Sequence, residues 1–164
     1  MIIMGIDPGL ATIGYGILDY KDNKKIEVVD YGVIETPKNE GLPQRLVMIE
    51  SGIMQLIEKF HPAEIAIEEL FFAQNVTTAL SVAHARGVIL MTCVKNCGSM
   101  FEYTPLQIKQ AITGYGRADK QQIQQMVKTF LSLKTIPKPD DAADALAIAL
   151  THIQSRSFKG AFQI

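Results

Sequence analysis

The sequence has only two cysteines, Cys93 and Cys97, and no histidine stands beside them. Their four-residue spacing places both on one face of a helix. A structural zinc site needs four ligands of this kind, and the chain has no second pair to complete the set. We therefore expect two buried free thiols, because unpaired cysteine is among the most buried residue types.

Long hydrophobic runs are also missing. The apolar run from Gly87 to Val94 is far shorter than the ~20 residues that span a membrane. Met1 leads directly into apolar residues without a basic leader or a cleavage site, so we expect a cytoplasmic protein. Repeats, low-complexity tracts and linkers are absent as well, which predicts a single domain over 1–154 and a frayed tail over 155–164.

Charge is unevenly distributed along the chain, although the formal net charge is only -1. Residues 1–70 carry 12 acidic and 6 basic side chains, whereas residues 71–139 carry 8 basic and 2 acidic ones. This asymmetry indicates an acidic site beside a basic surface, or simply two solvated faces of opposite sign.

The pattern of apolar and turn residues predicts an α/β fold. Segments rich in β-branched and aromatic residues, bounded by turn residues, predict the strands 2–7, 12–20, 25–35, 64–69 and 100–103. Helical spacing of apolar residues predicts the helices 41–60, 75–96, 106–113, 119–131 and 141–153. This order predicts a five-stranded mixed sheet, with the first three strands forming an antiparallel meander and helices on both faces.

Four acidic residues stand where a purely structural design would avoid charge. Asp7 ends the first apolar strand, Glu68 ends the fourth, and Asp141 and Asp144 share one face of the last helix. If the first and fourth strands are neighbours, all four carboxylates meet at one edge of the sheet. Such crowding favours divalent cations, and two Mg²⁺ ions could activate water and stabilise the leaving oxygen of a phosphodiester.

Each acidic residue also has an ordinary explanation. Asp7 begins a common Asp-Pro-Gly turn, and Glu68 could simply be solvated at the end of its strand. Asp141 could be a favourable charge at a helix start. Asp144 is harder to explain in this way, because it lies inside an alanine-rich helix.

The residues around these carboxylates resemble the RuvC family of Holliday-junction resolvases from about residue 2 to residue 153. The matching motifs are Gly5-Ile6-Asp7-Pro8-Gly9, Thr12-Ile13-Gly14-Tyr15-Gly16, Ala66-Ile67-Glu68 and Asp141-Ala142-Ala143-Asp144-Ala145-Leu146-Ala147-Ile148-Ala149. Shorter matches are Phe71, Asn75, Ala85-Arg86-Gly87-Val88, Lys109-Gln110 and Gly114-Tyr115-Gly116.

The resemblance implies a ribonuclease H-like fold, a homodimer, and Mg²⁺-dependent cutting of two opposed strands of four-way junction DNA. Mn²⁺ is an expected substitute, and the branch-migration motor of RuvA and RuvB type is an implied partner. The matching catalytic and metal-binding residues are Asp7, Glu68, Asp141 and Asp144. The expected DNA contacts are Phe71, Asn75, Arg86, Lys109, Arg117 and Lys120.

Two departures from the family pattern and three competing functions stay open. Asp140 adds a carboxylate beside Asp141, and Glu69 follows Glu68, although strand alternation favours Glu68. The first motif and its hairpin also resemble the phosphate loop of actin-like ATPases and sugar kinases. Those proteins need two lobes and a second glycine-rich loop, which 164 residues do not supply. The chain could also be a junction-binding protein without activity, or a nuclease that cuts RNA–DNA hybrids.

Overall fold

The computed structural model describes residues 1–70 and 76–164, and a five-stranded sheet forms its centre. The strands are β1 (Ile2–Asp7), β2 (Thr12–Tyr20), β3 (Ile26–Glu35), β4 (Glu64–Glu68) and β5 (Met100–Tyr103). They lie in the order β3-β2-β1-β4-β5, with β1, β2 and β3 antiparallel and β4 and β5 parallel to β1. This confirms the predicted mixed sheet and the antiparallel meander.

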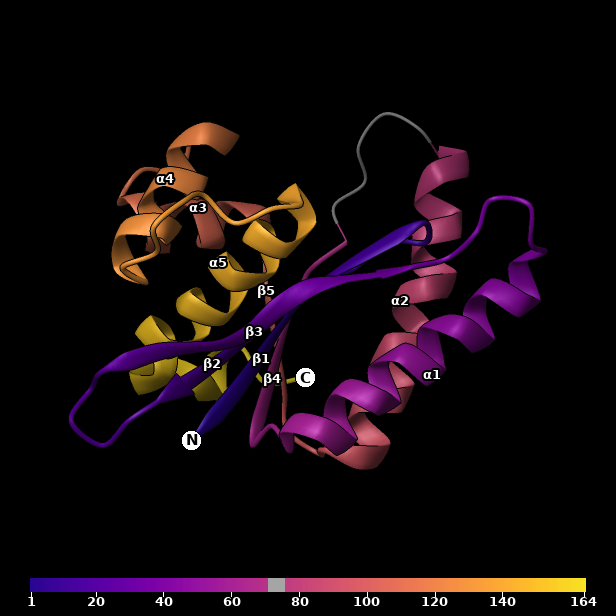
Figure 1. Cartoon of the computed structure of the whole chain (residues 1–164), viewed down its shortest axis with the longest axis horizontal. Coiled ribbons are helices and arrows are strands. Elements are labelled where there is room, and N and C mark those ends of the chain that lie inside the picture. Colours follow the sequence, from indigo (N-terminus) through magenta and orange to yellow (C-terminus); the bar gives the residue numbers. More distant parts are fainter. Residues whose placement is uncertain (71–75) are drawn as a thin grey trace.

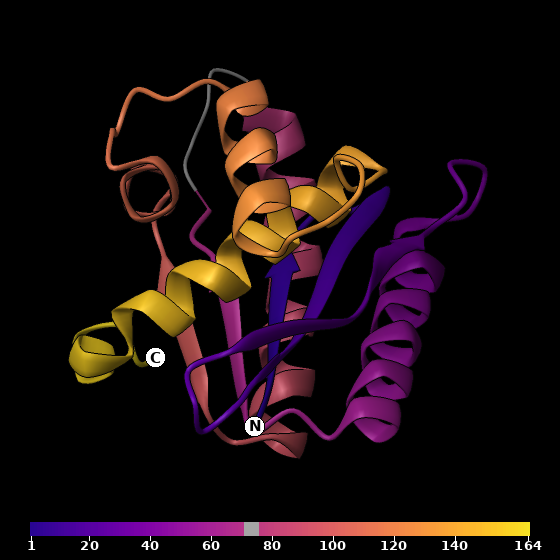
Figure 2. The ribbon, with the colours of Figure 1, turned by 60° about the vertical axis from the view of Figure 1, so that its left-hand side comes forward.

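Helices cover both faces of this sheet (Figure 1). One face carries α1 (Leu42–Phe60) and α2 (Val76–Asn96). The other face carries α3 (Pro105–Thr113), α4 (Lys120–Phe130) and α5 (Asp140–Ser155). Figure 2 shows α5 crossing the strands directly, with α3 and α4 outside it. The predicted elements are all present, with their ends shifted by one or two residues.

Alternation along the strands divides the core into two clusters. On β1, Ile3 packs against the α5 side, whereas Met4 and Ile6 pack against α1 and α2. On β4, Ile65 and Ile67 belong to the α1–α2 side and Ala66 to the α5 side. Because side chains point alternately to opposite faces, every second residue of these strands meets α5.

The two cysteines are free thiols, as predicted. Cys93 is buried, and burial raises the pKa of its thiol to about 12. Cys97 is only half-buried, so the expectation of burial is wrong for this residue, and its Sγ lies 3.1 Å from the backbone carbonyl oxygen of Pro62. Within the described residues, no helix is long and apolar enough to cross a membrane.

The C-terminal residues 155–164 do not fray as the sequence suggests. A 3₁₀ helix (Arg156–Ala161) continues from α5, and the chain then pairs with the outer edge of β5. The backbone N–H of Glu102 donates to the Phe162 carbonyl, and the N–H of Ile164 donates to the Met100 carbonyl. The unpaired edge of β5 offers the hydrogen-bonding partners that hold this segment.

Candidate active site

Asp7 and Glu68 end two neighbouring parallel strands, β1 and β4. The register pairs Gly5 with Ala66, so the residues two positions further along, Asp7 and Glu68, also lie side by side. Gly5 and Ala66 both face α5. Alternation therefore turns both carboxylates toward that helix, as the sequence predicts.

The helix α5 carries Asp141 and Asp144 and lies in direct contact with the sheet. A Cβ on Gly14 would lie 2.0 Å from the Asp141 carbonyl oxygen, and one on Gly5 would lie 2.1 Å from the Ala145 carbonyl oxygen. Any larger residue at these two positions would push α5 away from the strands. The two glycines thus allow the start of α5 to reach the ends of β1 and β4.

The titration behaviour of the carboxyl groups indicates that they are close together. Burial raises the pKa of Asp7 to about 8, with further increases from the Glu68, Asp144 and Asp141 carboxylates. Burial and then Asp144 raise the pKa of Glu68 to about 7, and burial also raises the pKa of Asp144. Like charges in a poorly solvated site disfavour ionisation, so the four side chains form one electrostatic unit.

Two lysines border this unit. Lys109 and Lys120 line a cavity of about 200 Å³ together with Glu68 and Asp144. The Lys120 ammonium lies 2.9 Å from a carboxylate oxygen of Asp144 and 3.7 Å from one of Asp140. Burial by itself lowers the pKa of Lys120, but the hydrogen bond to Asp144 and the attraction of the Asp144, Asp140 and Asp141 carboxylates together raise it. Both lysines therefore lie beside the carboxylates of Glu68 and Asp144.

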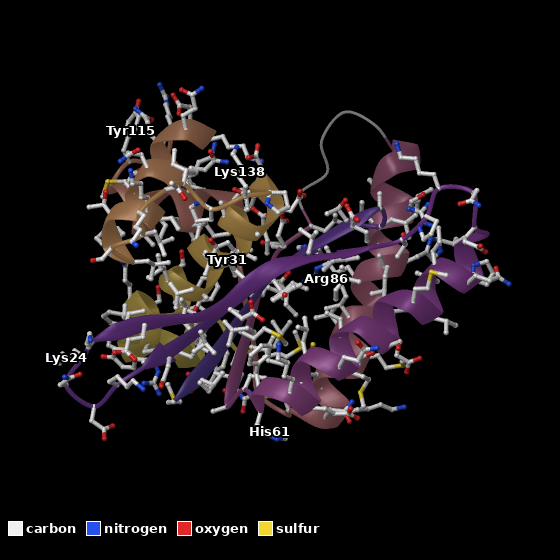
Figure 3. The ribbon with its side chains drawn as sticks, in the orientation of Figure 1. Lys24, Tyr31, His61, Arg86, Tyr115 and Lys138 are labelled. Atoms are coloured by element: carbon white, nitrogen blue, oxygen red, sulfur yellow. The ribbon has the colours of Figure 1, made fainter. Side chains whose placement is uncertain are left out.

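The two additional acidic residues, Asp140 and Glu69, have surroundings of their own. Asp140 accepts a hydrogen bond of 2.6 Å from Lys138, which lies beside the start of α5 (Figure 3). Glu69 follows the end of β4 with an exposed side chain, and its backbone N–H donates to the Tyr103 carbonyl. This placement agrees with the preference for Glu68 over Glu69.

The remaining expected DNA contacts have different surroundings. Arg117 is exposed in the turn between α3 and α4. Arg86 points from α2 toward the sheet (Figure 3), where it forms an ion pair with Glu102 of β5. Its Nε lies 3.5 Å from the Glu68 backbone carbonyl. Phe71 and Asn75 lie outside the described residues.

Arg86, one of the expected DNA contacts, pairs with an acidic residue within the fold. Glu102 lies opposite Ile67 in the β4–β5 ladder and meets Arg86 on the α2 side of the sheet. Sequence spacing does not reveal this partner, because it depends on which strand lies beside β4. Arg86 thus stabilises the strand end that carries Glu68.

The donor set of the site suits a hard divalent cation, because it consists of carboxylate oxygens. Among the described residues, no three His, Cys, Asp or Glu side chains stand close enough together to hold a metal ion. The Lys120 ammonium binds Asp144 and so competes with a cation for that carboxylate. The chemistry of the donors fits a metal, and metal binding would require Asp144 to release Lys120 and the carboxylates to move closer together.

A second opening borders Asp141. It has a volume of about 530 Å³, and the turn after β1, the start of α1 and part of α2 surround it. Lys38 and Arg45 supply its basic side chains. Sequence reasoning missed both residues, because a charge count over residues 1–70 hides two basic residues inside an acidic segment.

Comparison with known protein families shows to which family the chain belongs. The family model described as "Crossover junction endodeoxyribonuclease RuvC" matches residues 3–152. The chain belongs to the RuvC family. The matched range includes all four carboxylates and rules out an actin-like ATPase or sugar kinase.

Curated RuvC relatives match over almost the whole chain. The crossover junction endodeoxyribonuclease RuvC of Alkaliphilus oremlandii is 54% identical over 164 residues, covering 100% of this chain and 99% of the relative. The protein of the same name from Clostridioides difficile is 52% identical over 159 residues, covering 97% and 94%.

Solved RuvC structures share the fold. A Thermus thermophilus RuvC structure has a TM-score of 0.90 with 33% identity, covering 100% of both chains. T. thermophilus RuvC in complex with a Holliday junction substrate has a TM-score of 0.89 with 30% identity and the same coverage. The predicted RuvC resemblance and ribonuclease H-like fold are therefore confirmed.

Proposed function

We propose that this chain resolves four-way DNA junctions by hydrolysing phosphodiester bonds of the DNA. The active site consists of the carboxylates of Asp7, Glu68, Asp141 and Asp144. The observation that supports this most is the meeting of two parallel strand ends with the start of α5, which crowds the carboxylates enough to raise the pKa of Asp7 to about 8. A structural role would not require such crowding, because it destabilises the ionised site. The curated relatives carry the matching name of crossover junction endodeoxyribonuclease.

We further propose that the four carboxylates hold Mg²⁺, with two ions in each site and Mn²⁺ as a functional substitute. Such ions would activate a water molecule and stabilise the leaving oxygen of the phosphodiester. The chain's own residues then have distinct tasks. Lys120 exchanges its ion pair with Asp144 for one with the substrate phosphate. Lys109, which lines the same cavity, also binds this phosphate.

DNA binding then extends over the basic segment around the cavity. Lys109 and Lys120 line the cavity, and Arg117 is exposed in the neighbouring turn. We keep Phe71 and Asn75 as proposed DNA contacts from the family resemblance. Arg86 acts on DNA indirectly, because its contact with the Glu68 carbonyl positions the catalytic strand end.

A homodimer would present two such sites to opposed strands of a junction, which has near two-fold symmetry. We propose that α2 forms the interface. Between residues 79 and 94, the exposed residues of α2 recur mostly at spacings of three and four: Leu80, Ala83, His84, Gly87, Met91 and Val94. A Cβ on Gly87 would meet nothing within 4 Å, so this chain's own packing does not require glycine there. Glycine in a helix costs ~1 kcal/mol, and close approach of a second α2 would explain it.

Paired nicks at symmetric positions follow from such a dimer. From the family resemblance, we also propose cooperation with a branch-migration motor of RuvA and RuvB type. We place the reaction in the cytoplasm, where chromosomal DNA is available.

The test uses a labelled four-way junction, a linear duplex of the same sequence and an RNA–DNA hybrid, each with Mg²⁺ or with EDTA. We expect symmetric nicks in the junction alone, lost with EDTA and in Asp7→Asn. Asp22→Asn is the matched control, because Asp22 is exposed on the hairpin between β2 and β3. Tight junction binding without cutting would favour a binding protein, and cutting of the hybrid would favour a different nuclease.

A further inference from the structure

Arg45 is a half-buried cation near the site. Lys120 pairs with Asp144, Lys138 with Asp140, and Arg86 with Glu102. Arg45 is half-buried, yet in the described part of the chain no acidic side chain pairs with its guanidinium. A guanidinium partly removed from water in this way favours an anionic partner from elsewhere.

A relay of hydrogen bonds fixes the position of Arg45. Its Nε donates to the Thr36 hydroxyl oxygen at 2.8 Å, and this hydroxyl donates to the Leu10 carbonyl at 2.6 Å. The Thr36 backbone N–H also donates to the Ala11 carbonyl. Thr36 is 4% exposed, so water does not compete for these bonds. The relay connects Arg45 to the turn that follows the catalytic residue Asp7.

The relay uses the Nε donor of Arg45, whereas the terminal nitrogens of a guanidinium carry four further N–H donors that suit an anionic ligand. The Arg45 side chain lines the opening of about 530 Å³ that also contains Lys38 and Asp141. The carboxylates therefore have basic side chains in two places: Lys109 and Lys120 in one cavity, and Arg45 and Lys38 in the other opening.

We propose that Arg45, assisted by Lys38, binds a backbone phosphate that flanks the phosphodiester to be cut. This inference rests on the proposed nuclease function and extends its substrate site. The planar guanidinium fits two phosphate oxygens at once, which a lysine ammonium cannot do. A DNA strand that is bound on both sides of the carboxylates cannot slide, so the phosphodiester to be cut stays aligned with them. Arg45 is a positioning residue, because it contacts the flanking phosphate and not the reacting one.

The first experiment measures junction binding across a range of salt concentrations in the presence of Ca²⁺ with a cleavage-deficient Asp7→Asn background. The binding constant K falls as salt rises, and each lost phosphate contact reduces the steepness of log K against log salt by ~0.9. We expect Arg45→Gln to lower the slope by about this amount and to weaken binding about 5- to 50-fold. Lys24→Gln is the matched control, because Lys24 lies at the tip of the distant β2–β3 hairpin (Figure 3).

The second experiment identifies the phosphate. Single neutral methylphosphonates are placed at successive positions around the cleavage site, and binding by the Asp7→Asn protein is compared with binding by Asp7→Asn/Arg45→Gln. One position should weaken binding by the first protein and leave the second unaffected. Equal responses at every position, or an unchanged salt slope for Arg45→Gln, would overturn the proposal.

Two further variants separate positioning from folding. Thr36→Val preserves side-chain shape and the charge of Arg45 but removes the relay, so we expect weaker binding and a raised KM. Arg45→Lys should keep the salt slope and lose part of the affinity. Junction cutting by the unmodified protein tests the nuclease function separately, so that function could stand even where Arg45 proves unimportant.

Discussion

Asp7 and Glu68 hold protons at pH values where most carboxyl groups in proteins have lost them. Burial is the main reason, and the neighbouring carboxylates add to it. The folded chain therefore stores unfavourable electrostatic energy at the site, which a divalent cation would relieve. Lys120 relieves part of it by its ion pair with Asp144.

Asp7→Asn should stabilise the protein at alkaline pH when no divalent cation is added. The ordinary pKa of Asp7 is 3.8 and its folded pKa is about 8. Between these values the folded state keeps a proton that the unfolded state has lost, so raising the pH destabilises the fold. We expect a gain of about 1–3 kcal/mol at pH 8 and little change near pH 4.

Thermal unfolding at both pH values, with EDTA present, measures this effect. Asp22→Asn should leave the melting temperature unchanged at each pH. A melting temperature for Asp7→Asn that differs from the unmodified protein equally at pH 4 and pH 8 would contradict the assigned titration.

Arg86 offers a second prediction about single side chains. Its ion pair with Glu102 is only partly exposed, with side chains that are 15% and 24% accessible. Arg86→Met should leave the Glu102 carboxylate without this partner and cost about 1–3 kcal/mol. Arg86→Met/Glu102→Gln should recover part of the loss, as urea unfolding would measure. Full additivity of the two single changes would contradict a direct interaction.

The contact between α5 and the sheet decides whether the carboxylates meet at all. The glycines of β1 and β2 lie against the backbone and side chains of α5, at distances that exclude even one extra methyl group. The far end of α5 is fixed as well, because His152 lies 2.9 Å from a Glu64 carboxylate oxygen and 2.8 Å from the Tyr103 hydroxyl. The helix is thus held at both ends against one face.

Gly14→Ala should reduce junction cutting strongly. The new methyl group would lie 2.0 Å from the Asp141 carbonyl oxygen, so the start of α5 must move. Small displacements of catalytic groups can cost ~100-fold in rate. Cleavage assays together with thermal unfolding measure both consequences. Gly160→Ala is the control, because a Cβ there meets nothing within 4 Å. Unchanged cutting by Gly14→Ala would show that α5 tolerates a shift.

The whole molecule has a polar edge that carries the site and an apolar helix face that no described element of the chain covers. Exposed fractions of 56% for Leu80, 46% for Met91 and 51% for Val94 are high for residues of this kind. The proposed α2 interface would bury them and place two sites on one junction. In the proposed dimer, a surface away from the carboxylates would set the symmetry of cutting.

Gly87→Leu should convert the proposed dimer to a monomer, because a large side chain prevents close approach of two α2 helices. Sedimentation equilibrium measures the change, and we expect the dissociation constant to rise at least ~100-fold. Val47→Glu on α1 is the control, since Val47 is 63% exposed but lies outside the α2 stripe. If Gly87→Leu had the same dimer mass in solution as the unmodified protein, the interface would have to lie elsewhere.

Much of the fold and the carboxylate set could be predicted from the sequence, because the signals are local. Strand alternation indicates that Glu68, rather than Glu69, shares a face with Ala66, and helical spacing places Asp141 and Asp144 together. The ends of the strands and helices follow from turn residues and capping residues. These rules depend only on residues that are close together in the sequence, so they can be applied without knowledge of the tertiary structure.

Tertiary structure alone decided which charges far apart in the sequence lie close together. Arg86 meets Glu102 because β5 lies beside β4, and Arg45 shares an opening with Asp141 because α1 packs near the turn after β1. The C-terminal segment is ordered because the edge of β5 was open to it. These contacts join residues far apart in the sequence, and their energies depend on distances that only the folded chain sets.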